Sequence, residues 1–309
     1  MPDLKLRPAV RKAAPLLISV SSVSGGGKTY TSLLLAAGLA GPNGKVGMLD
    51  TENGRGEMYA DSPGIMAALP NGFAYLGIDP PFSPVRYVEH LAVMEKEGVN
   101  VAVIDSGTHE WEGIGGCNDI AENEKLRGMP NWSKAKREHK RFMNFLLSTK
   151  MHVIVCLRAR DKIKIQKDAQ GKEQIIPLGI QPIAEKSFVY EMLLSLSLDE
   201  KTHVGEGIKV PEGLQGIFDK PRLLTKADGE LIAKWNDGGS KKHEAEEALR
   251  RLQIRATEAV DSGLAAYEKF FKELSKQERL MLEAFHQGYK QQAEEADKLL
   301  ASREAGSAG

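Results

Sequence analysis

Short apolar runs alternate with longer amphipathic stretches along the first half of the chain. Short apolar runs are typical of buried strands, and apolar positions at helical spacing are typical of the helices that cover them. The expected strands are residues 16–20, 46–49, 99–104 and 152–157, and the expected helices are residues 29–41, 83–98 and 133–149. This alternation predicts a parallel α/β sheet with helices on both faces.

The pattern changes in the second half of the chain. Residues 158–166 alternate charged and apolar side chains, residues 167–172 have the composition of a turn, and residues 175–178 are apolar again. We therefore expect a β-hairpin here. Residues 190–198 and 222–226 are expected to add antiparallel strands. The predicted fold class is an α/β core with a mainly parallel sheet, antiparallel additions and a C-terminal helical appendage.

The C-terminal part is helical by composition. Residues 241–304 are rich in Ala, Glu, Lys and Leu at helical spacing, and they follow a segment at 236–240 that is expected to be a linker. Two amphipathic helices flank Ser275, a candidate N-cap with Glu278 three residues later. This module is expected either to brace the core or to mediate protein contacts and assembly. The predicted organisation is an N-terminal arm (1–14), a core (15–239) and a helical C-terminal module (240–309).

Charge and cysteine content narrow the choice of function classes. Lys and Arg together number 42, as do Asp and Glu, so a nucleic-acid site must be a local basic patch. The two cysteines, Cys117 and Cys156, are too few for a disulfide framework or a zinc site of usual spacing. No apolar run has membrane-spanning length, and the N-terminus lacks the apolar core of a signal peptide. We expect a cytoplasmic protein without a membrane partner.

Residues 22–29, SVSGGGKT, lie between the first expected strand and the first expected helix. Successive backbone N–H groups of such a glycine-rich turn surround phosphate oxygens at the positive end of the helix. The Lys28 ammonium would reach the β- and γ-phosphates, and the Thr29 hydroxyl would coordinate Mg²⁺. The usual motif begins with Gly where this chain has Ser22, a small residue that can serve at the turn. The expected cofactors are ATP and Mg²⁺, and the expected nucleotide-binding residues are Ser24, Gly25, Gly26, Gly27, Lys28, Thr29 and Tyr30.

Asp105 ends the apolar run at residues 99–104. In phosphate-loop enzymes a carboxylate at this position lies beside the Mg²⁺ ion, so Asp105 is the second expected metal residue. The next residue is Ser106, where many AAA-type motors place the Glu that activates water. Asp50 and Glu52 instead follow the preceding expected strand, a position that is also compatible with a solvated strand end.

The segment from about residue 16 to residue 239 resembles the phage-encoded RecA-like ATPases. The motifs that carry the resemblance are SVSGGGKT, GMLDTENGRG, VAVIDSGTHEWEG, MPNWSKAKREHKRFMN and VIVCLRARDK. The resemblance implies a RecA-like P-loop core in which Glu52 is the general base and Lys28 assists catalysis. Glu110 and Glu112, in the segment that follows Asp105, are rival candidates for the base. It implies action on single-stranded DNA in phage homologous recombination, by annealing or strand exchange. The implied partners are single-stranded DNA, further copies of the chain in a filament or ring, and a single-strand binding protein, in the host cytoplasm.

Two local basic patches are candidates for contact with DNA. The first is a row of cations at every second position, formed by Arg158, Arg160, Lys162 and Lys164. An extended strand presents such a row on one face, where it can follow the phosphates of a single strand. A γ-phosphate sensor, above all Arg158 or Arg160, and a solvated hairpin are the alternatives.

The second patch belongs to the helix expected at residues 133–149. Lys134, Arg137 and Arg141 share one side of that helix. Trp132 precedes the patch and is a candidate platform for base stacking, whereas a solvated helix face is the alternative interpretation. His109, Cys117 and His139 have spacings that match no usual metal-ligand set, and structural roles are expected for them.

Two other functions fit the same motifs. One is a DNA motor or remodelling ATPase for replication or packaging, which would act on duplex DNA or protein. The other is a nucleotide-gated scaffold that binds ATP without significant turnover and recruits a partner through its helical tail.

Overall fold

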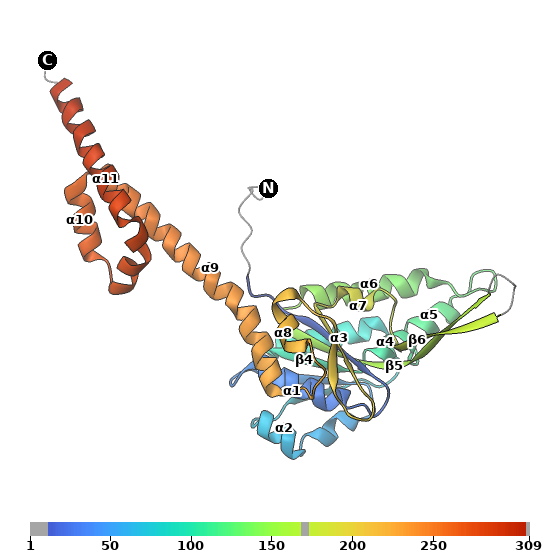
Figure 1. The fold of residues 1–309 in the computed structure, drawn as a ribbon. Helices are drawn as coiled ribbons and strands as arrows, with labels where there is room; N and C mark the ends of the chain where they lie inside the picture. Colours follow the sequence, from blue (N-terminus) through green and yellow to red (C-terminus); the bar gives the residue numbers. More distant parts are fainter. Residues whose placement is uncertain (1–11, 168–172, 307–309) are drawn as a thin grey trace. The chain divides into compact units, whose positions relative to one another are not determined.

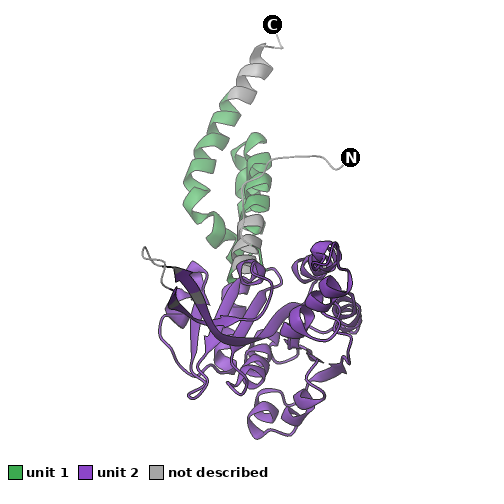
Figure 2. Ribbon diagram, turned by 90° about the vertical axis from the view of Figure 1, so that its right-hand side faces the viewer, with its two compact units in different colours: residues 1–13, 237–309 green, residues 14–236 purple. Residues whose placement is uncertain are grey.

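The computed structural model of the chain describes residues 12–167 and 173–306 (Figure 1). These residues divide into two compact units, one of residues 14–236 and one that holds residues 12–13 and 237–306 (Figure 2). None of the helices in the described ranges combines the length and the apolar character needed to cross a membrane.

A mostly parallel sheet forms the centre of the larger unit. Within the described residues it has eight strands in the order β3-β2-β4-β5-β1-β7-β8, with β6 paired to β5. The pairs among β1 to β5 and between β1 and β7 are parallel, whereas β6 and β8 are antiparallel additions. The strands are β1 Leu17–Ser22, β2 Val46–Asp50, β3 Ala74–Gly77, β4 Val101–Asp105, β5 His152–Lys167, β6 Glu173–Pro182, β7 Leu194–Leu198 and β8 Gly205–Lys209. The predicted α/β fold class is confirmed.

Helices cover the sheet because alternate side chains of each strand point to opposite faces. On one face, Ile18 and Val20 of β1 belong to a core cluster with Leu33 of α1. On the other, Val155 of β5 belongs to a cluster with Phe142 of α6. The helices of this unit are α1 Lys28–Ala40, α2 Pro63–Ala68, α3 Pro84–Lys96, α4 Thr108–Glu112, α5 Cys117–Asn123, α6 Trp132–Ser148, α7 Phe188–Glu191 and α8 Gln215–Phe218, with the 3-10 turns η1 Arg55–Tyr59 and η2 Glu212–Leu214.

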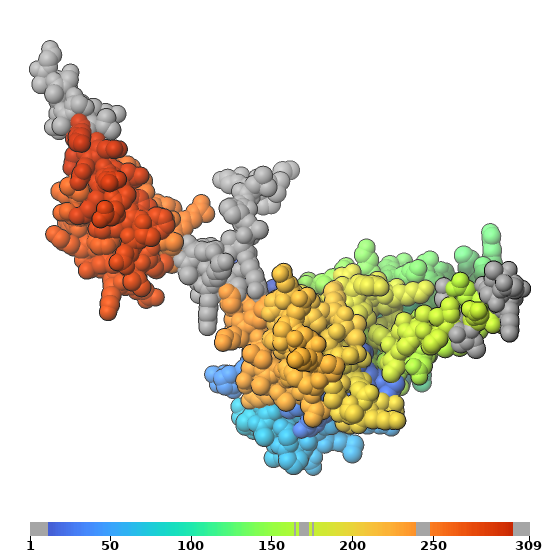
Figure 3. Space-filling model, in the orientation of Figure 1, coloured from blue at the N-terminus to red at the C-terminus, as the bar shows by residue number. Residues whose placement is uncertain are grey.

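The predicted β-hairpin is confirmed as the outer half of β5 and its partner β6. In Figure 3 the yellow-green hairpin extends from the body of the larger unit. Its apolar positions stay exposed, with Ile163 at 55% and Ile165 at 59%. The turn predicted at its tip includes residues 168–172, which lie outside the described residues.

Three predictions from the second half of the chain are wrong. Residues 190–198 were expected to add an antiparallel strand, but only residues 194–198 are a strand, and this strand, β7, runs parallel to β1 because it extends the parallel core sheet. Residues 222–226 form no strand, since Arg222 makes a single bridge to Gly205. Residues 236–240 are not a linker but lie inside α9 Lys226–Asp261. A glycine costs a helix only about 1 kcal/mol relative to alanine, so the glycines of this segment are tolerated between strong helix formers.

The smaller unit has its own core. Tyr267, Leu274 and Leu282 are buried together between α9, α10 Leu264–Glu273 and α11 Lys276–Gly306. The predicted capping box is confirmed, because the Ser275 N–H donates to Glu278 Oε2 (2.8 Å) and the Glu278 N–H donates to Ser275 Oγ (3.3 Å).

Candidate functional site

The glycine-rich loop joins β1 to α1 at the carboxyl-terminal edge of the sheet. Gly25 and Gly27 have φ angles of 85° and 80°, which L side chains rarely adopt. Gly26 has no such torsion, but a Cβ there would lie 1.9 Å from Ser22 Oγ. Ser22 is fully buried, and its hydroxyl has no hydrogen-bond partner among the described residues. The serine at the first position of the motif therefore fills the space beside Gly26.

This packing leads to a testable double substitution. We expect Gly26→Ala to weaken ATP binding by about tenfold. Overpacking costs about 1–3 kcal/mol, and a shift of the loop that relieves it also moves the backbone N–H groups expected to bind the phosphates. Ser22→Gly removes the two nearest atoms that a new Cβ would meet and leaves the Val23 carbonyl oxygen, at 3.3 Å, as the next nearest, so the variant with both substitutions should recover most of the affinity. Titration with a fluorescent ATP analogue measures both effects. Equal weakening in the single and double variants would show that Ser22 does not restrict position 26.

Lys28 is the first residue of α1 and is almost fully buried. Its Nζ donates to the carbonyl oxygens of Ser22 (3.2 Å) and Val23 (2.9 Å). The ammonium therefore lies across the glycine-rich loop, where the phosphates of ATP are expected to bind. Burial lowers the pKa of Lys28, and the charges of Asp105 and Glu52 partly oppose that shift. The other predicted loop residues lie around it: Ser24 and Gly25 are exposed, and the ring of Tyr30 packs near that of Tyr59.

The structure brings the two predicted metal residues together. The Thr29 hydroxyl donates a hydrogen bond to Asp105 Oδ2. Burial raises the pKa of Asp105 to about 6, with the hydrogen bond from Thr29 opposing the shift. A hydroxyl and a carboxylate are oxygen ligands of the kind that Mg²⁺ binds, in a site completed by water and substrate phosphates.

Glu52 lies just beyond the end of β2 and is held by Arg158 of β5. The Arg158 Nε donates to Glu52 Oε1 (3.0 Å), and its Nη2 donates to both carboxylate oxygens (2.6 and 2.5 Å). His109 Nε2 is 4.0 Å from Glu52 Oε1, and its Nδ1 is 2.8 Å from Thr51 Oγ1. Burial lowers the pKa of His109. Glu52 is thus the centre of a charged cluster at the edge where the loop and Asp105 lie.

Asp50 is a structural residue of this cluster. Its carboxylate accepts hydrogen bonds from the backbone N–H groups of Glu52 (2.5 Å) and Gly56 (2.9 Å) and from the Tyr75 hydroxyl (3.1 Å). These bonds fix the turn that follows β2. Burial and the neighbouring charge of Asp50 raise the pKa of Tyr75 to about 12. The turn therefore sets the direction in which Glu52 leaves the strand.

The two rival glutamates lie elsewhere. The Glu110 carboxylate is buried and accepts hydrogen bonds from His139 Nδ1 (2.9 Å) and Cys117 Sγ (3.3 Å). Glu112 forms an ion pair with Arg160 (3.7 Å). In contrast, the charge of Glu52 acts on both Lys28 and Asp105.

Glu110, Cys117 and His139 form a buried triad whose ligand-type atoms all lie within 4.8 Å of one another. Cys117 and His139 both hydrogen-bond to the Glu110 carboxylate, so all three side chains have hydrogen-bond partners within the triad. Burial alone would lower the pKa of His139, but the hydrogen bond and charge of Glu110 outweigh it, and the pKa is raised. Sequence spacing gave no indication that these residues meet.

The raised pKa predicts a pH-dependent contribution to stability. A histidine whose pKa is higher in the folded state stabilises that state below the unfolded pKa, near 6.5, and the contribution disappears as the pH rises through the folded value. We expect the free energy of unfolding to fall more between about pH 6 and about pH 8.5 in the wild type than in His139→Gln. Urea unfolding at both pH values measures the difference. Parallel losses in the two proteins would contradict a charged His139.

The cations of the two predicted basic patches do not all face the same place in the structure. Arg158 faces Glu52, whereas Arg160 and Lys162 line a separate cavity. The side chain of Lys164 lies outside the described part of the chain. On α6, Lys134 is paired with Glu124 (2.9 Å), and the other two predicted cations, Arg137 and Arg141, are exposed.

Some neighbours of the site carry no signal in the sequence. A Cβ on Gly27 would lie 3.2 Å from Nδ1 of His203, so this ring lies against the glycine-rich loop. His203 comes from the turn after β7, which is the other parallel neighbour of β1. Its place beside the loop depends on that strand pairing.

A protein-family model described as an AAA domain matches residues 14–227, more than half of the chain. The chain belongs to this AAA domain family. The AAA domain and its glycine-rich loop together indicate a P-loop ATPase, which implies use of a nucleotide. Ser106 stands where many AAA-type motors carry Glu, and the Glu52 carboxylate, just beyond the end of the neighbouring strand β2, is paired with Arg158.

Several solved structures are similar to this AAA domain protein. One is the RadB recombinase, with 21% identity and a TM-score of 0.37, covering 64% of this chain and 83% of that one. A KaiC-like protein from Pyrococcus horikoshii OT3 has 15% identity and a TM-score of 0.36. The match covers 66% of this chain and 88% of the KaiC-like protein. An ATP synthase subunit from Nanoarchaeum equitans has 13% identity and a TM-score of 0.36. The match covers 90% of this chain and 68% of the subunit. Comparison with curated proteins gives no match.

Proposed function

We propose that the chain binds ATP with Mg²⁺ and hydrolyses it at the carboxyl-terminal edge of β1, β2 and β4. The observation that supports this most directly is the convergence of the glycine-rich loop, the Thr29–Asp105 pair and Glu52 at that edge. Lys28 and the loop N–H groups bind the phosphates, and Thr29 and Asp105 hold the metal. When bound, Mg²⁺ neutralises charge that develops on the phosphate oxygens.

In this proposal Glu52 orients the attacking water and takes its proton. Arg158 engages both oxygens of that carboxylate, so Glu52 is released only when the guanidinium moves. Arg158 is also the first cation of the row that continues to Arg160 and Lys162. We infer that a phosphate, either the γ-phosphate of ATP or one of a bound DNA strand, draws Arg158 away and frees Glu52 for catalysis.

The proposed polymer is single-stranded DNA, in phage homologous recombination by annealing or strand exchange. Support comes from the motif resemblance and from exposed cations on β5 and α6 in a chain of zero formal net charge. A flexible single strand can follow cations along an extended strand in a way that a stiff duplex cannot. ATP-bound protomers would assemble along the DNA as a filament or ring, hydrolysis would release them, and a single-strand binding protein is a further proposed partner.

Binding to labelled oligonucleotides in gel-shift experiments tests this function. We expect single-stranded DNA to bind more tightly with ATP than with ADP, and more tightly than a duplex of the same length. Affinity should fall steeply with salt, because cations that bind phosphates release counterions. Preference for duplex would favour the DNA motor, and tight ATP binding without turnover on any nucleic acid would favour the scaffold.

A further inference from the structure

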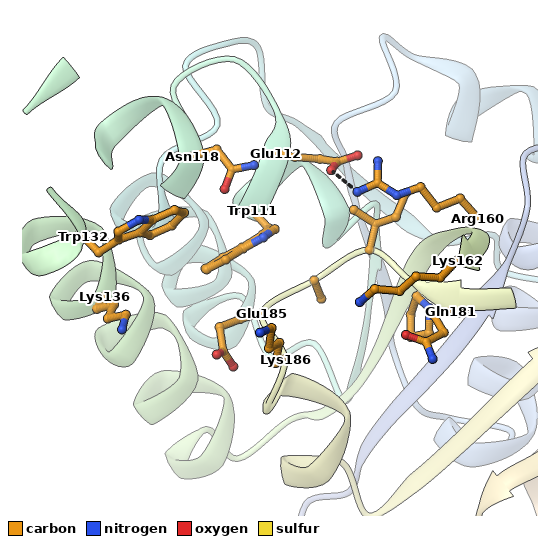
Figure 4. Close-up of a pocket in the computed structure, with 13 residues that line it drawn as sticks. Trp111, Glu112, Asn118, Trp132, Lys136, Arg160, Lys162, Gln181, Glu185 and Lys186 are labelled. Carbon is orange, nitrogen blue, oxygen red and sulfur yellow. Dashed lines mark ion pairs between the residues drawn. The ribbon is translucent and has the colours of Figure 1, made fainter. Parts of the chain in front are cut away.

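A cavity of about 440 Å³ lies beside the β5–β6 hairpin, away from the glycine-rich loop (Figure 4). Its volume is within the range of about 300–1,000 Å³ that is usual for pockets of small organic groups. Aromatic, cationic and amide side chains line it together. The residues on which the inference depends are Trp111, Trp132, Lys136, Arg160, Lys162 and Gln181.

Two tryptophans form an aromatic wall of the cavity. Trp111 of α4 and Trp132 of α6 are stacked, with ring centroids 5.5 Å apart and an interplanar angle of 21°. In Figure 4, Trp111 lies between Trp132 and the hairpin residues Arg160 and Lys162. Both indoles are partly exposed. A flat aromatic surface that remains open to a cavity is suited to stacking against another flat ring.

The buried triad fixes this wall. Glu110, Cys117 and His139 belong to α4, α5 and α6, so their hydrogen bonds tie together the helices that carry the two tryptophans. The ring of His139 also meets Trp111 edge to face, with centroids 5.6 Å apart. A platform held in this way loses little conformational freedom when a ligand stacks on it.

Positive charge exceeds negative charge around the cavity. Four cations line it, whereas Glu112 and Glu185 are its carboxylates. Glu112 is paired with Arg160 (3.7 Å), and Glu185 accepts a hydrogen bond from the Ser187 N–H (2.5 Å). The remaining charge favours an anion next to the aromatic wall. Gln181 and Asn118 add amide groups that can hydrogen-bond to the edge of a base.

We propose that this cavity binds one unpaired nucleobase of a single-stranded DNA, stacked on the Trp111–Trp132 pair. Arg160 and Lys162 hold the adjacent phosphates, since both cations lie on the strand that runs from the nucleotide site to the cavity. A base in duplex DNA must first lose its pairing and stacking, so single-stranded DNA is the favoured ligand. This inference rests on the proposed function and places the single strand two residues along β5 from Arg158.

Fluorescence tests the stacking contact directly. In a Trp235→Phe background, Trp111 and Trp132 are the remaining tryptophans of the chain. We expect a (dT) oligonucleotide of about 20 nucleotides, longer than a typical single-strand site, to quench their emission. In an anisotropy assay with a labelled oligonucleotide, Trp111→Ala should weaken binding by about tenfold, whereas Trp111→Phe should retain most of the affinity.

Lysine variants on α6 provide a matched comparison. Lys136 lines the cavity, and Lys140 lies one turn further along α6, outside it. We expect Lys136→Gln to weaken oligonucleotide binding about threefold or more and Lys140→Gln to leave it within about twofold, since each phosphate contact contributes to affinity. ATP affinity and the thermal melt of each variant report whether it is folded.

The outcomes separate the two proposals. If wild-type protein binds the oligonucleotide while Trp111→Ala and Trp132→Ala bind equally well, the cavity is not the base site, although the proposed function stands. If the wild type binds no single-stranded oligonucleotide with ATP, the proposed function is wrong, and the base site proposed here is wrong with it. Quenching by free thymidine monophosphate equal to that by the oligonucleotide would also overturn a strand-binding site, since it would indicate a pocket for mononucleotides.

Discussion

Lys28→Ala abolishes ATP binding at concentrations that saturate the wild type. The ammonium is the one group of the loop that carries a full positive charge, and it lies across the loop through its bonds to Ser22 and Val23. A hydrogen bond to a charged group contributes about 1.5–3 kcal/mol, so the loss of contacts to two phosphates should weaken binding about a hundredfold or more. Calorimetric titration with ATP and Mg²⁺ measures the change.

Lys45→Ala is the matched control for this prediction. Lys45 is an exposed lysine whose Nζ donates to the Glu97 carbonyl (3.0 Å), outside the glycine-rich loop. Its replacement removes the same charge and should leave ATP affinity within about twofold, because an exposed cation outside the site contributes little. Wild-type affinity in a folded Lys28→Ala would show that the phosphates do not bind at residues 22–29.

Glu52→Gln retains ATP binding and loses turnover. The amide keeps the size of the side chain and one acceptor oxygen for Arg158, but it cannot take a proton from water. General base catalysis typically contributes about 10²–10⁴-fold, so the rate of hydrolysis should fall within that range while ATP affinity changes little. Single-turnover hydrolysis of radiolabelled ATP measures the chemical step, and titration measures the affinity.

Two further glutamates complete the comparison. Glu57→Gln changes an exposed acid in η1, just after the Glu52 turn, and should leave turnover unchanged. Glu112→Gln replaces the rival base, which is paired with Arg160. If Glu112→Gln stops hydrolysis and Glu52→Gln does not, the base lies at the end of α4, and Glu52 only orients Arg158.

The features predicted correctly from the sequence are those with short-range signals. The loop at residues 22–29 carries its function in eight consecutive positions, and the strand that ends in Asp105 is a continuous apolar run. Parallel pairing then brings strand ends together, since the Asp50 position is in register with Asp105. The β3 and β8 strands were not predicted, because they are short, lie at sheet edges and are only partly buried.

The side-chain contacts within the candidate site join residues that are far apart in the sequence, so no short stretch of sequence predicts them. Glu52 and Arg158 are separated by 106 positions, and they meet because β2 and β5 both flank β4. The Ser22 hydroxyl next to Gly26 depends on the torsions of the intervening turn. Likewise, Trp132 was recognised as a candidate stacking platform, but its pairing with Trp111 depends on how α4 and α6 pack.

ATP turnover by the full chain, with single-stranded DNA, with duplex DNA and without DNA, tests the central claim most directly. We expect the wild type to hydrolyse ATP, single-stranded DNA to stimulate the rate more than duplex does, and Glu52→Gln to stay inactive under all three conditions while still binding ATP. Normal turnover in Glu52→Gln, or a wild-type rate that single-stranded DNA leaves unchanged, would contradict a Glu52-dependent ATPase coupled to single-stranded DNA.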